Sequence, residues 1–451
     1  MNIPEKIAPL LLIALSILQY SCNTTEPDGK AGLNISVEDI SCTEAWIKLT
    51  VSGISSQSVI EIKADDKLVK QVSVTGTSID SIVYIDSLLP GKEYRFSASM
   101  GKGNAAEISS RTLDTTSHNF TWQTFTFGEA GAGSSTLYDV AIIDKNNIWA
   151  VGEIYMNDSL GNPDPNFFNL IKWDGTQWKP ERVYFKNSHG QSFLAPMKSI
   201  FAFSANDIWI GLDQVIYWNG TTYKSIEIPD AVFHSWINKM WGCSSNDLYI
   251  VGNSGSIVHY KNGSWTKIES GTDVDLQDIS GTPDLNEIWT CGWDYNNGRV
   301  SLLRIYKNNV ESIWDSQTNT TLNTYRGTLN SLYANGNKEF VLAGRQIFRH
   351  SLVDKSQVKY EWVKTSNGSK VFEPGNYVYR IKGSSKNNIA IAGDAAMIWH
   401  FNGATWYKYS ELYNLDDRLY GLAVTDNVIV AVGKRYSPGT LGGALLLIGR
   451  R

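Results

Sequence analysis

One short segment concentrates the residue types that recognise ligands. Residues 293–299 (Trp-Asp-Tyr-Asn-Asn-Gly-Arg) place two aromatic rings beside a carboxylate, two amides and a guanidinium. A flat ring stacks on the C–H side of a sugar while polar neighbours bind the sugar hydroxyls. Tyr, Trp and Arg also dominate the energetics of protein–protein contacts. The segment therefore indicates binding of a glycan or of a protein.

Residues of the same kinds recur in several other polar segments. The candidate ligand-binding residues are Trp293, Asp294, Tyr295, Arg299, Trp236, His234, Tyr155, Phe185, Tyr325, Arg326, Asp394, Arg345 and Tyr436. Any one of these aromatic side chains can serve only to pack its own loop, so the expectation of a binding surface rests on the set as a whole.

The sequence contains few signals of catalysis. A glycosidase needs two carboxylates roughly 5 to 9 Å apart. Five residues could supply such a pair, and the sequence favours no two of them: Asp158, Asp164, Asp213, Asp294 and Asp394. Metal-protease, serine-hydrolase and phosphate-loop motifs are missing from the sequence, and no Cys/His spacing is typical of a metal site. We expect no catalytic residue, cofactor or metal, with a glycoside hydrolase or polysaccharide lyase as the alternative.

A repeated phrase must position these residues. An apolar stretch, a polar turn and a second apolar stretch that ends in glycine occur seven times. The marker glycines are Gly152, Gly211, Gly252, Gly292, Gly344, Gly393 and Gly433. A repeat of about 40 to 50 residues with short strands is typical of a β-propeller. We predict an all-β fold with a seven-bladed propeller over residues 119–451, and six or eight blades as weaker alternatives.

The ends of the repeat region predict how the propeller closes. The seventh repeat supplies three strands before the chain ends, whereas residues 120–127 alternate like a strand that has no blade of its own. We expect this N-terminal strand to complete blade seven. Within the repeats, His259 and His400 occupy matching third-strand positions, and Cys243 and Cys291 lie at apolar positions, so we interpret all four as structural and both thiols as buried.

The lengths of the connections distinguish the two faces of the predicted propeller. The first-to-second and third-to-fourth strand turns are short, such as Asp174-Gly175 and Asn402-Gly403. Most insertions fall in the other two connections, which share the opposite face, and they include residues 153–168, 180–196 and 317–328. Loops lengthen where recognition occurs, and neutral drift would scatter insertions over both faces. The long-loop face is therefore the expected binding face.

Residues 31–113 have a different pattern of short alternating strands. Leu89-Pro90-Gly91-Lys92-Glu93-Tyr94 resembles a tyrosine corner, in which a Tyr hydroxyl bonds to upstream backbone, and Trp46 lies in an early strand. The segment resembles a fibronectin type III domain, a resemblance that implies a β-sandwich acting as a spacer or docking module.

The N-terminus resembles a bacterial lipoprotein signal. Lys6 precedes the apolar run of residues 7–18, and the run is followed by Cys22. The resemblance implies a signal peptide over 1–22, lipidation of Cys22, and a polar tether over 23–30. Glu26 and Asp28 resemble the surface-export signal of Bacteroidetes lipoproteins, and the repeats resemble uncharacterised exported Bacteroidetes propellers. An ordinary cleaved secretion signal is the alternative.

Composition limits the partners. The formal net charge is −5 with a sequence pI near 5.8, and no Lys/Arg cluster is present, so nucleic acid is not expected. We expect a monomeric outer-membrane lipoprotein, exposed at the cell surface, whose long-loop face binds a glycan or an envelope or host protein. A scaffold for protein–protein interaction in an envelope complex is the further alternative.

Overall fold

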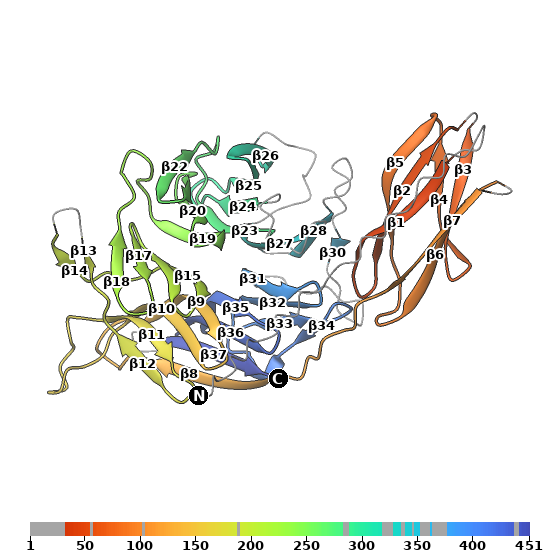
Figure 1. Ribbon diagram of the computed structural model, residues 1–451. Coiled ribbons are helices and arrows are strands. Elements are labelled where there is room, and N and C mark those ends of the chain that lie inside the picture. The colour runs from red at the N-terminus through yellow and green to blue at the C-terminus, as the bar shows by residue number, and fades with distance from the viewer. Residues whose placement is uncertain are drawn as a thin grey trace, which may run out of the picture.

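The computed structural model describes residues 32–54, 57–101, 104–186, 190–282, 288–317, 328–334, 339–344, 347–351, 361–362, 377–436 and 442–451. In this part of the chain, seven four-stranded antiparallel sheets form a ring, and a two-sheet sandwich lies beside it (Figure 1). The predicted all-β fold and the predicted number of blades are confirmed.

Each blade runs from an inner strand at the central channel to an outer strand at the rim. The inner strands are β9 (Thr136–Asp144), β15 (Ser199–Ser204), β19 (Ile237–Ser244), β23 (Leu276–Gly281), β27 (Leu329–Ala334), β31 (Val378–Ser385) and β35 (Asp417–Val424). The second strands are β10 (Asn147–Ile154), β16 (Asp207–Gly211), β20 (Asp247–Gly252), β24 (Ile288–Trp293), β28 (Glu339–Gly344), β32 (Asn388–Gly393) and β36 (Val428–Arg435).

The two remaining positions of each blade are the third strand and the outer strand. The third strands are β11 (Phe168–Trp173), β17 (Val215–Trp218), β21 (Ile257–Lys261), β25 (Val300–Tyr306), β29 (Ile347–Ser351), β33 (Ile398–Phe401) and β37 (Gly443–Arg450). The outer strands are β12 (Trp178–Glu181), β18 (Tyr223–Ile226), β22 (Ser264–Ile268), β26 (Asn309–Asp315), β30 (Glu361–Trp362), β34 (Trp406–Lys408) and β8 (Thr121–Phe127).

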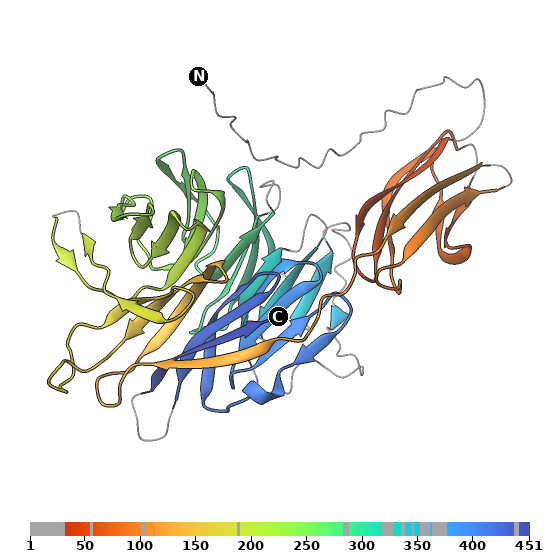
Figure 2. The same cartoon turned by 60° about the horizontal axis from the view of Figure 1, so that its bottom comes forward.

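Strand β8 completes the last blade, as predicted. It pairs antiparallel with β37 over seven residue pairs, from Ala444↔Phe127 to Arg450↔Thr121. Phe125 and Phe127 then pack edge-on against Trp178 of blade one, with ring centroids 5.9 and 5.8 Å apart. The first strand of the propeller therefore joins its last blade to its first blade (Figure 2).

The marker glycines allow a close approach of backbones. A Cβ on Gly152, Gly393 or Gly433 would lie within about 2 Å of a carbonyl oxygen on or next to the inner strand of the same blade. Any residue larger than glycine at these positions would therefore push the two inner strands of the blade apart.

Gly211 differs, because the nearest atoms to its Cβ would belong to the Ile237 side chain and not to the backbone. Ile237 donates its N–H to Leu212, as Met197 does to Gly152, so Leu212 occupies the marker position in blade two.

The N-terminal sandwich packs one three-stranded sheet on one four-stranded sheet. The strands of the first, in spatial order, are β1 (Gly32–Ile40), β2 (Ala45–Ser52) and β5 (Ser78–Ile85). The strands of the second are β4 (Lys67–Val74), β3 (Ser58–Ala64), β6 (Glu93–Met100) and β7 (Asn104–Arg111). Tyr94 accepts a hydrogen bond from the Leu89 N–H at 2.9 Å, which is the bond expected of a tyrosine corner.

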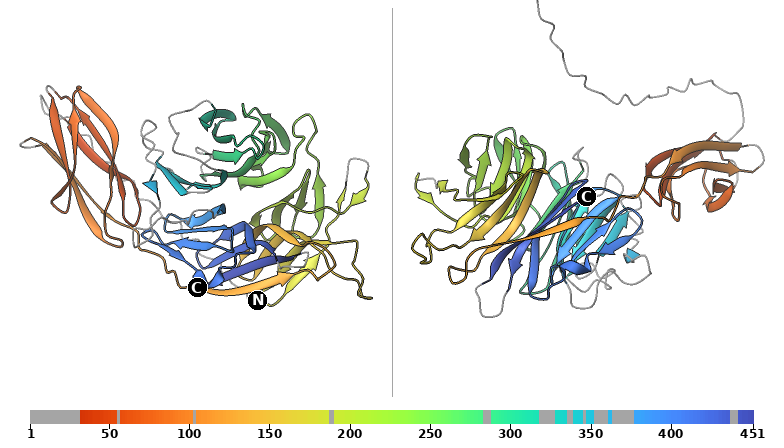
Figure 3. Two further views of the ribbon diagram at one scale, coloured as in Figure 1. Left: turned by 180° about the vertical axis from the view of Figure 1, so that it is seen from behind. Right: turned by 90° about the horizontal axis from the view of Figure 1, so that it is seen from below.

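The sandwich contacts blade six on the face of short turns, opposite the long loops. Lys386 forms an ion pair with Asp39, and its Nζ lies 5.3 Å from the centre of the Trp46 ring. In the linker, Thr116 donates its N–H to the Asn402 carbonyl at 3.1 Å. Figure 3 shows the sandwich beside this part of the ring from two further sides. These contacts leave the long-loop face uncovered by the sandwich.

A chain of hydrogen bonds fixes the linker. The His118 and His400 Nδ1 atoms lie 2.8 Å apart, His118 Nε2 lies 3.1 Å from the Thr405 hydroxyl, and His400 Nε2 lies 2.8 Å from the Asn388 amide oxygen. With both rings neutral, Thr405 donates to His118, His118 to His400, and His400 to Asn388. A second proton on His118 or His400 would place an N–H where an acceptor is needed. Burial lowers the pKa of both rings, that of His400 to about 3, with His118 and Arg451 adding to the effect on His400.

Cys243 departs from the prediction. Its side chain is exposed near the turn that ends β19, whereas Cys42 and Cys291 are buried. Residue 243 lies in the bulge between Gly242 and Ser244, where the strand leaves the core. Alternation in the sequence could not show this, since a bulge shifts the face to which each side chain points.

Acid is expected to destabilise the propeller through these histidines. Because the folded pKa of His400 lies below its unfolded value near 6.5, the folded protein binds fewer protons, and stability is lost as pH falls from about 6.5 toward 3. The free energy of unfolding should fall by up to about 1.4 kcal/mol per pH unit between roughly pH 6 and pH 4. Denaturant melts at several pH values measure this slope, and His400→Gln should flatten it. An equal slope in the variant would contradict the assignment to His400.

Candidate functional site

The long-loop face carries most of the exposed large apolar side chains of the propeller. Among the described residues, nine such side chains are exposed on the propeller, and seven lie in connections that open on this face: Leu160, Tyr184, Trp236, Tyr295, Tyr413, Leu415 and Tyr436. The other two are Tyr306 and Tyr407. The asymmetry matches that of loop length, so the same face carries both the long loops and most of these exposed side chains.

The segment after β24 presents one aromatic ring to solvent. Tyr295 is 85% exposed, and its ring lies 5.8 Å from that of the half-buried Trp293. Asp294 accepts the Asn296 N–H at 2.8 Å and so shapes the turn. Arg299 binds Asp315 through Nε at 3.1 Å and Nη2 at 2.7 Å, and it also bonds to Asp273. Arg299 and Asp294 therefore hold the loop, and Tyr295 is the residue free to make contacts.

The predicted residues near blades one to three also divide into side chains that are exposed and side chains that pack their own loop. Trp236 is 51% exposed, and His234 is also exposed, with Nδ1 3.9 Å from Asp230. Phe185 is fully buried and stacks on Phe193 at 5.4 Å across the hairpin of β13 (Phe185–Lys186) and β14 (Ser192–Phe193). The prediction of Phe185 as a ligand-binding residue is therefore wrong. A hydrophobic loop residue in a long insertion is needed to pack that insertion.

A second group of residues surrounds the channel mouth, and sequence reasoning missed most of it. Tyr138, Tyr379 and Tyr420 directly follow the first buried apolar residue of their inner strands, at equivalent places in blades one, six and seven. The repeated Tyr was a usable signal in the sequence. None of the predicted ligand-binding residues lies on an inner strand, although one edge of each inner strand lines the channel.

Three of the predicted residues, Asp394, Tyr436 and Tyr155, belong to this channel-mouth group. Asp394 pairs with Arg418 across blades six and seven, with the carboxylate oxygen 3.4 Å from Nε. Tyr436 lies 3.3 Å from the Tyr420 hydroxyl, and the Arg418 guanidinium stacks 5.2 Å from its ring. Burial raises the pKa of Tyr379 and Tyr420 well above the usual range. These phenols therefore act as neutral donors and acceptors.

Tyr155 helps to orient a carboxylate at the same mouth. Its hydroxyl donates to Glu153 at 3.0 Å, and Tyr138 donates to the other oxygen of the same carboxylate. Burial, followed by the hydrogen bond to Glu153, raises the pKa of Tyr155 to about 12. The Lys198 Nζ lies 3.2 Å from the centre of the Tyr138 ring. The mouth thus combines phenol, carboxylate and ammonium groups.

The channel itself is lined by one equivalent position from each inner strand. These ring residues are Asp139, Ser199, Lys239, Asp278, Ser331, Arg380 and Gly421. Asp139 accepts the Ile200 N–H at 3.0 Å, and Asp278 accepts the Leu332 N–H at 3.1 Å. Ser331 accepts the Ile381 N–H at 3.1 Å. In each case the side chain satisfies an N–H of the next blade's inner strand, whose channel edge has no partner strand.

Two ion pairs cross the channel at this level. Lys239 Nζ lies 2.6 Å from both oxygens of Asp139, joining blades three and one. Lys382 Nζ lies 2.8 and 2.9 Å from the oxygens of Asp278, joining blades six and four. Both carboxylates and Lys239 are buried, so removing one partner would leave an unpaired charge in the core.

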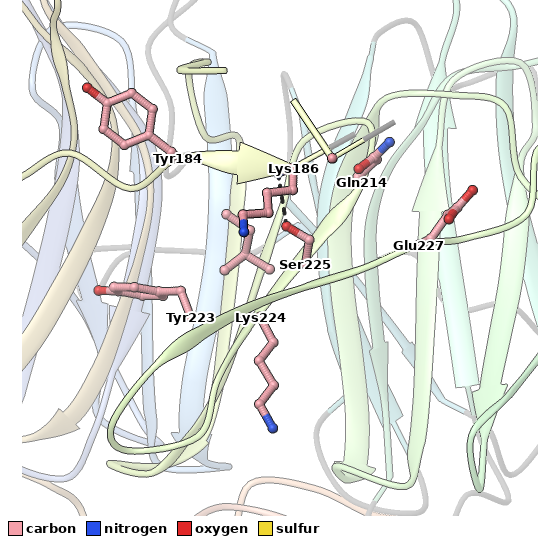
Figure 4. A pocket seen from close by; sticks show the side chains of 9 residues that line it. Tyr184, Lys186, Gln214, Tyr223, Lys224, Ser225 and Glu227 are labelled. Atoms are coloured by element: carbon pink, nitrogen blue, oxygen red, sulfur yellow. Dashed lines mark hydrogen bonds between the residues drawn. The ribbon is translucent and has the colours of Figure 1, made fainter. Parts of the chain in front are cut away.

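A pocket of about 450 Å³ lies where the β13–β14 hairpin meets the outer half of blade two (Figure 4). Its lining combines two phenols with polar side chains: Tyr184, Tyr223, Lys186, Gln214, Ser225 and Glu227. Figure 4 shows the two tyrosines on one side of the pocket and Gln214 and Glu227 on the other. Ser225 accepts the Lys186 N–H at 3.1 Å, which ties the hairpin to the blade.

Three predicted residues, Tyr325, Arg326 and Arg345, lie outside the described residues, as does Cys22. Within the described ranges, no group of three or more His, Cys, Asp or Glu side chains is arranged to hold a metal ion. No helix in the same ranges is both long and apolar enough to cross a bilayer. The predicted residues that the structure does describe fall into separate groups around the face and do not meet in one cleft.

Comparison with known proteins identifies the fold. No protein-family model matches the chain, and no curated protein matches it. A solved structure described as "YCF48 bound to D1 peptide" is 14% identical, with a TM-score of 0.51, over 75% of this chain and 100% of that chain. The WD40 propeller of Doa1 (12% identical, TM-score 0.48, 73% and 97% covered) and YCF48 from Cyanidioschyzon merolae (12%, 0.47, 73% and 98%) also match. This chain therefore contains a β-propeller, the fold of the peptide-bound YCF48 structure.

Proposed function

We propose that this protein is a binding module whose long-loop face contacts a polypeptide partner. The observation that carries the proposal is the concentration of exposed Tyr, Trp and Leu side chains on that face. They project from separate loops around the ring, as contact residues of a broad interface do, and Tyr and Trp lose little conformational entropy when they are buried by a partner.

The position of the sandwich supports the same proposal. It docks against blade six on the opposite face through Lys386 and the linker, so the long-loop face remains open to a large partner. The solved YCF48 propeller described as bound to a peptide gives a precedent for peptide binding by this architecture.

Site-specific crosslinking in cells that produce the protein tests the proposal. A photoreactive amino acid at Trp236 or Tyr295 should give discrete adducts of protein mass, because both side chains project from the proposed contact face. Tyr306 is a matched control, since it is 41% exposed and lies at a short turn of the other face. Equal adducts from Tyr306 would refute the assignment of the face. The absence of protein adducts from every position would refute a polypeptide partner.

A glycan is the second candidate ligand, and the pocket in blade two favours it. Tyr184 is 49% exposed, Tyr223 lines the same side, and Gln214 and Glu227 lie opposite. An aromatic face with amide and carboxylate groups opposite can stack on a pyranose and bond its hydroxyls. This site is distinct from the segment 293–299 that the sequence favoured.

Affinity electrophoresis through gels cast with plant, host-mucosal and microbial polysaccharides tests this second function. Tyr184→Ala should abolish any retardation, because it removes the most exposed ring of the pocket, while Tyr306→Ala should leave retardation unchanged. Retardation that survives Tyr184→Ala would exclude this pocket as the glycan site. No retardation in any gel would count against glycan binding for the polymers included.

We also propose that the protein is displayed from the outer membrane by lipid attached to Cys22, on the basis of the resemblance of residues 1–30 to a lipoprotein signal. Metabolic labelling with an alkyne palmitate analogue should label the wild-type protein and spare Cys22→Ser. Labelling of both forms, or of neither, would count against this anchor.

A further inference from the structure

Five charged side chains among the described residues interact electrostatically in the central channel, and together they carry one more positive than negative charge. The negative groups are Asp139 and Asp278, and the positive groups are Lys239, Lys382 and Arg380. Two of the cations are paired directly with the two carboxylates. Arg380 is the cation that remains, on β31 at the ring position of blade six.

The Arg380 guanidinium is only partly satisfied by the protein. Its Nη1 donates to the carbonyl oxygens of Asn330 and Tyr379, both at 3.0 Å. Its Nε is buried and has no hydrogen-bond partner. Among the described residues, no carboxylate lies within ion-pair distance of it, and a guanidinium whose Nε is buried without a counter-charge is costly.

The surplus charge also acts on Lys239. Burial lowers the pKa of this amine, the attraction of Asp139 opposes that effect, and repulsion from Lys382 and Arg380 adds to it. A bound anion would relieve this repulsion. It would satisfy the free Nε–H of Arg380 at the same time.

We propose that the channel binds one small monovalent inorganic anion, of the size of chloride, at Arg380. One negative charge balances the surplus. The ion pairs from Lys239 and Lys382 already cross the channel, so a larger anion would have to break them. The Lys382 side chain retains 18% exposure and Arg380 is half-buried, so an ion can reach the site from solvent. This site is independent of the polypeptide and glycan surfaces proposed above.

Thermal unfolding of the full-length mature protein in chloride tests the proposal. Sodium chloride replaces sodium gluconate at constant ionic strength, which removes general screening as a cause. The wild-type Tm should rise by roughly 2 °C or more with chloride and then follow a saturating curve, since the anion binds only the folded state. Arg380→Gln should lose this dependence. Arg418→Gln, which removes an exposed arginine at the channel mouth, should keep it.

The ³⁵Cl line width of chloride in the presence of the wild-type protein gives a second measurement, which remains decisive should Arg380→Gln fail to fold. Broadening that bromide competes away supports the site. A Tm that is equal in chloride and gluconate, together with an unbroadened line, overturns the proposal. A chloride-dependent Tm that persists in Arg380→Gln overturns the placement at Arg380.

Discussion

The first and last blades of the ring must be held together, and here one strand pairing makes the joint. Strand β8 pairs with β37 through seven residues and packs Phe125 and Phe127 on blade one. Because β8 enters the ring on the short-turn face, the linker and the sandwich must lie on that side. Lys386, Thr116 and the His118–His400 pair then hold them there. The exposure of the opposite face follows from how the ring closes.

The inside of the ring imposes a second constraint. Each inner strand has one edge without a partner strand, and its N–H groups need acceptors. Asp139, Asp278 and Ser331 supply them to the next blade. Acidic acceptors bring buried charge, which Lys239 and Lys382 neutralise across the channel. The need to pair these backbone N–H groups thus explains the polar side chains of the channel. It does not explain Arg380, whose positive charge has no carboxylate partner among the described residues.

The two faces have correspondingly different roles. On the short-turn face, polar side chains bond to linker and sandwich, and Tyr407 stacks on His118. On the long-loop face, Tyr295 and Leu160 project from loops in which Asp294 and Asp158 accept backbone N–H groups. Loops held by their own hydrogen bonds lose little order when they are buried, which suits the polypeptide contact proposed for this face.

The sequence alone determined the architecture, since the repeat, its turns and the unpaired strand at 120–127 are local patterns that admit few closed arrangements. It also determined which face carries the long loops, because strand order places alternate connections on opposite sides. Only the tertiary structure decided which aromatic side chains are free. Phe185 is buried by its own hairpin, whereas Tyr295 and Trp236 are exposed. The tertiary structure also decided which charged side chains meet in the channel. Asp139 and Lys239 are 100 positions apart and come into contact only when the ring closes and brings distant inner strands to one axis.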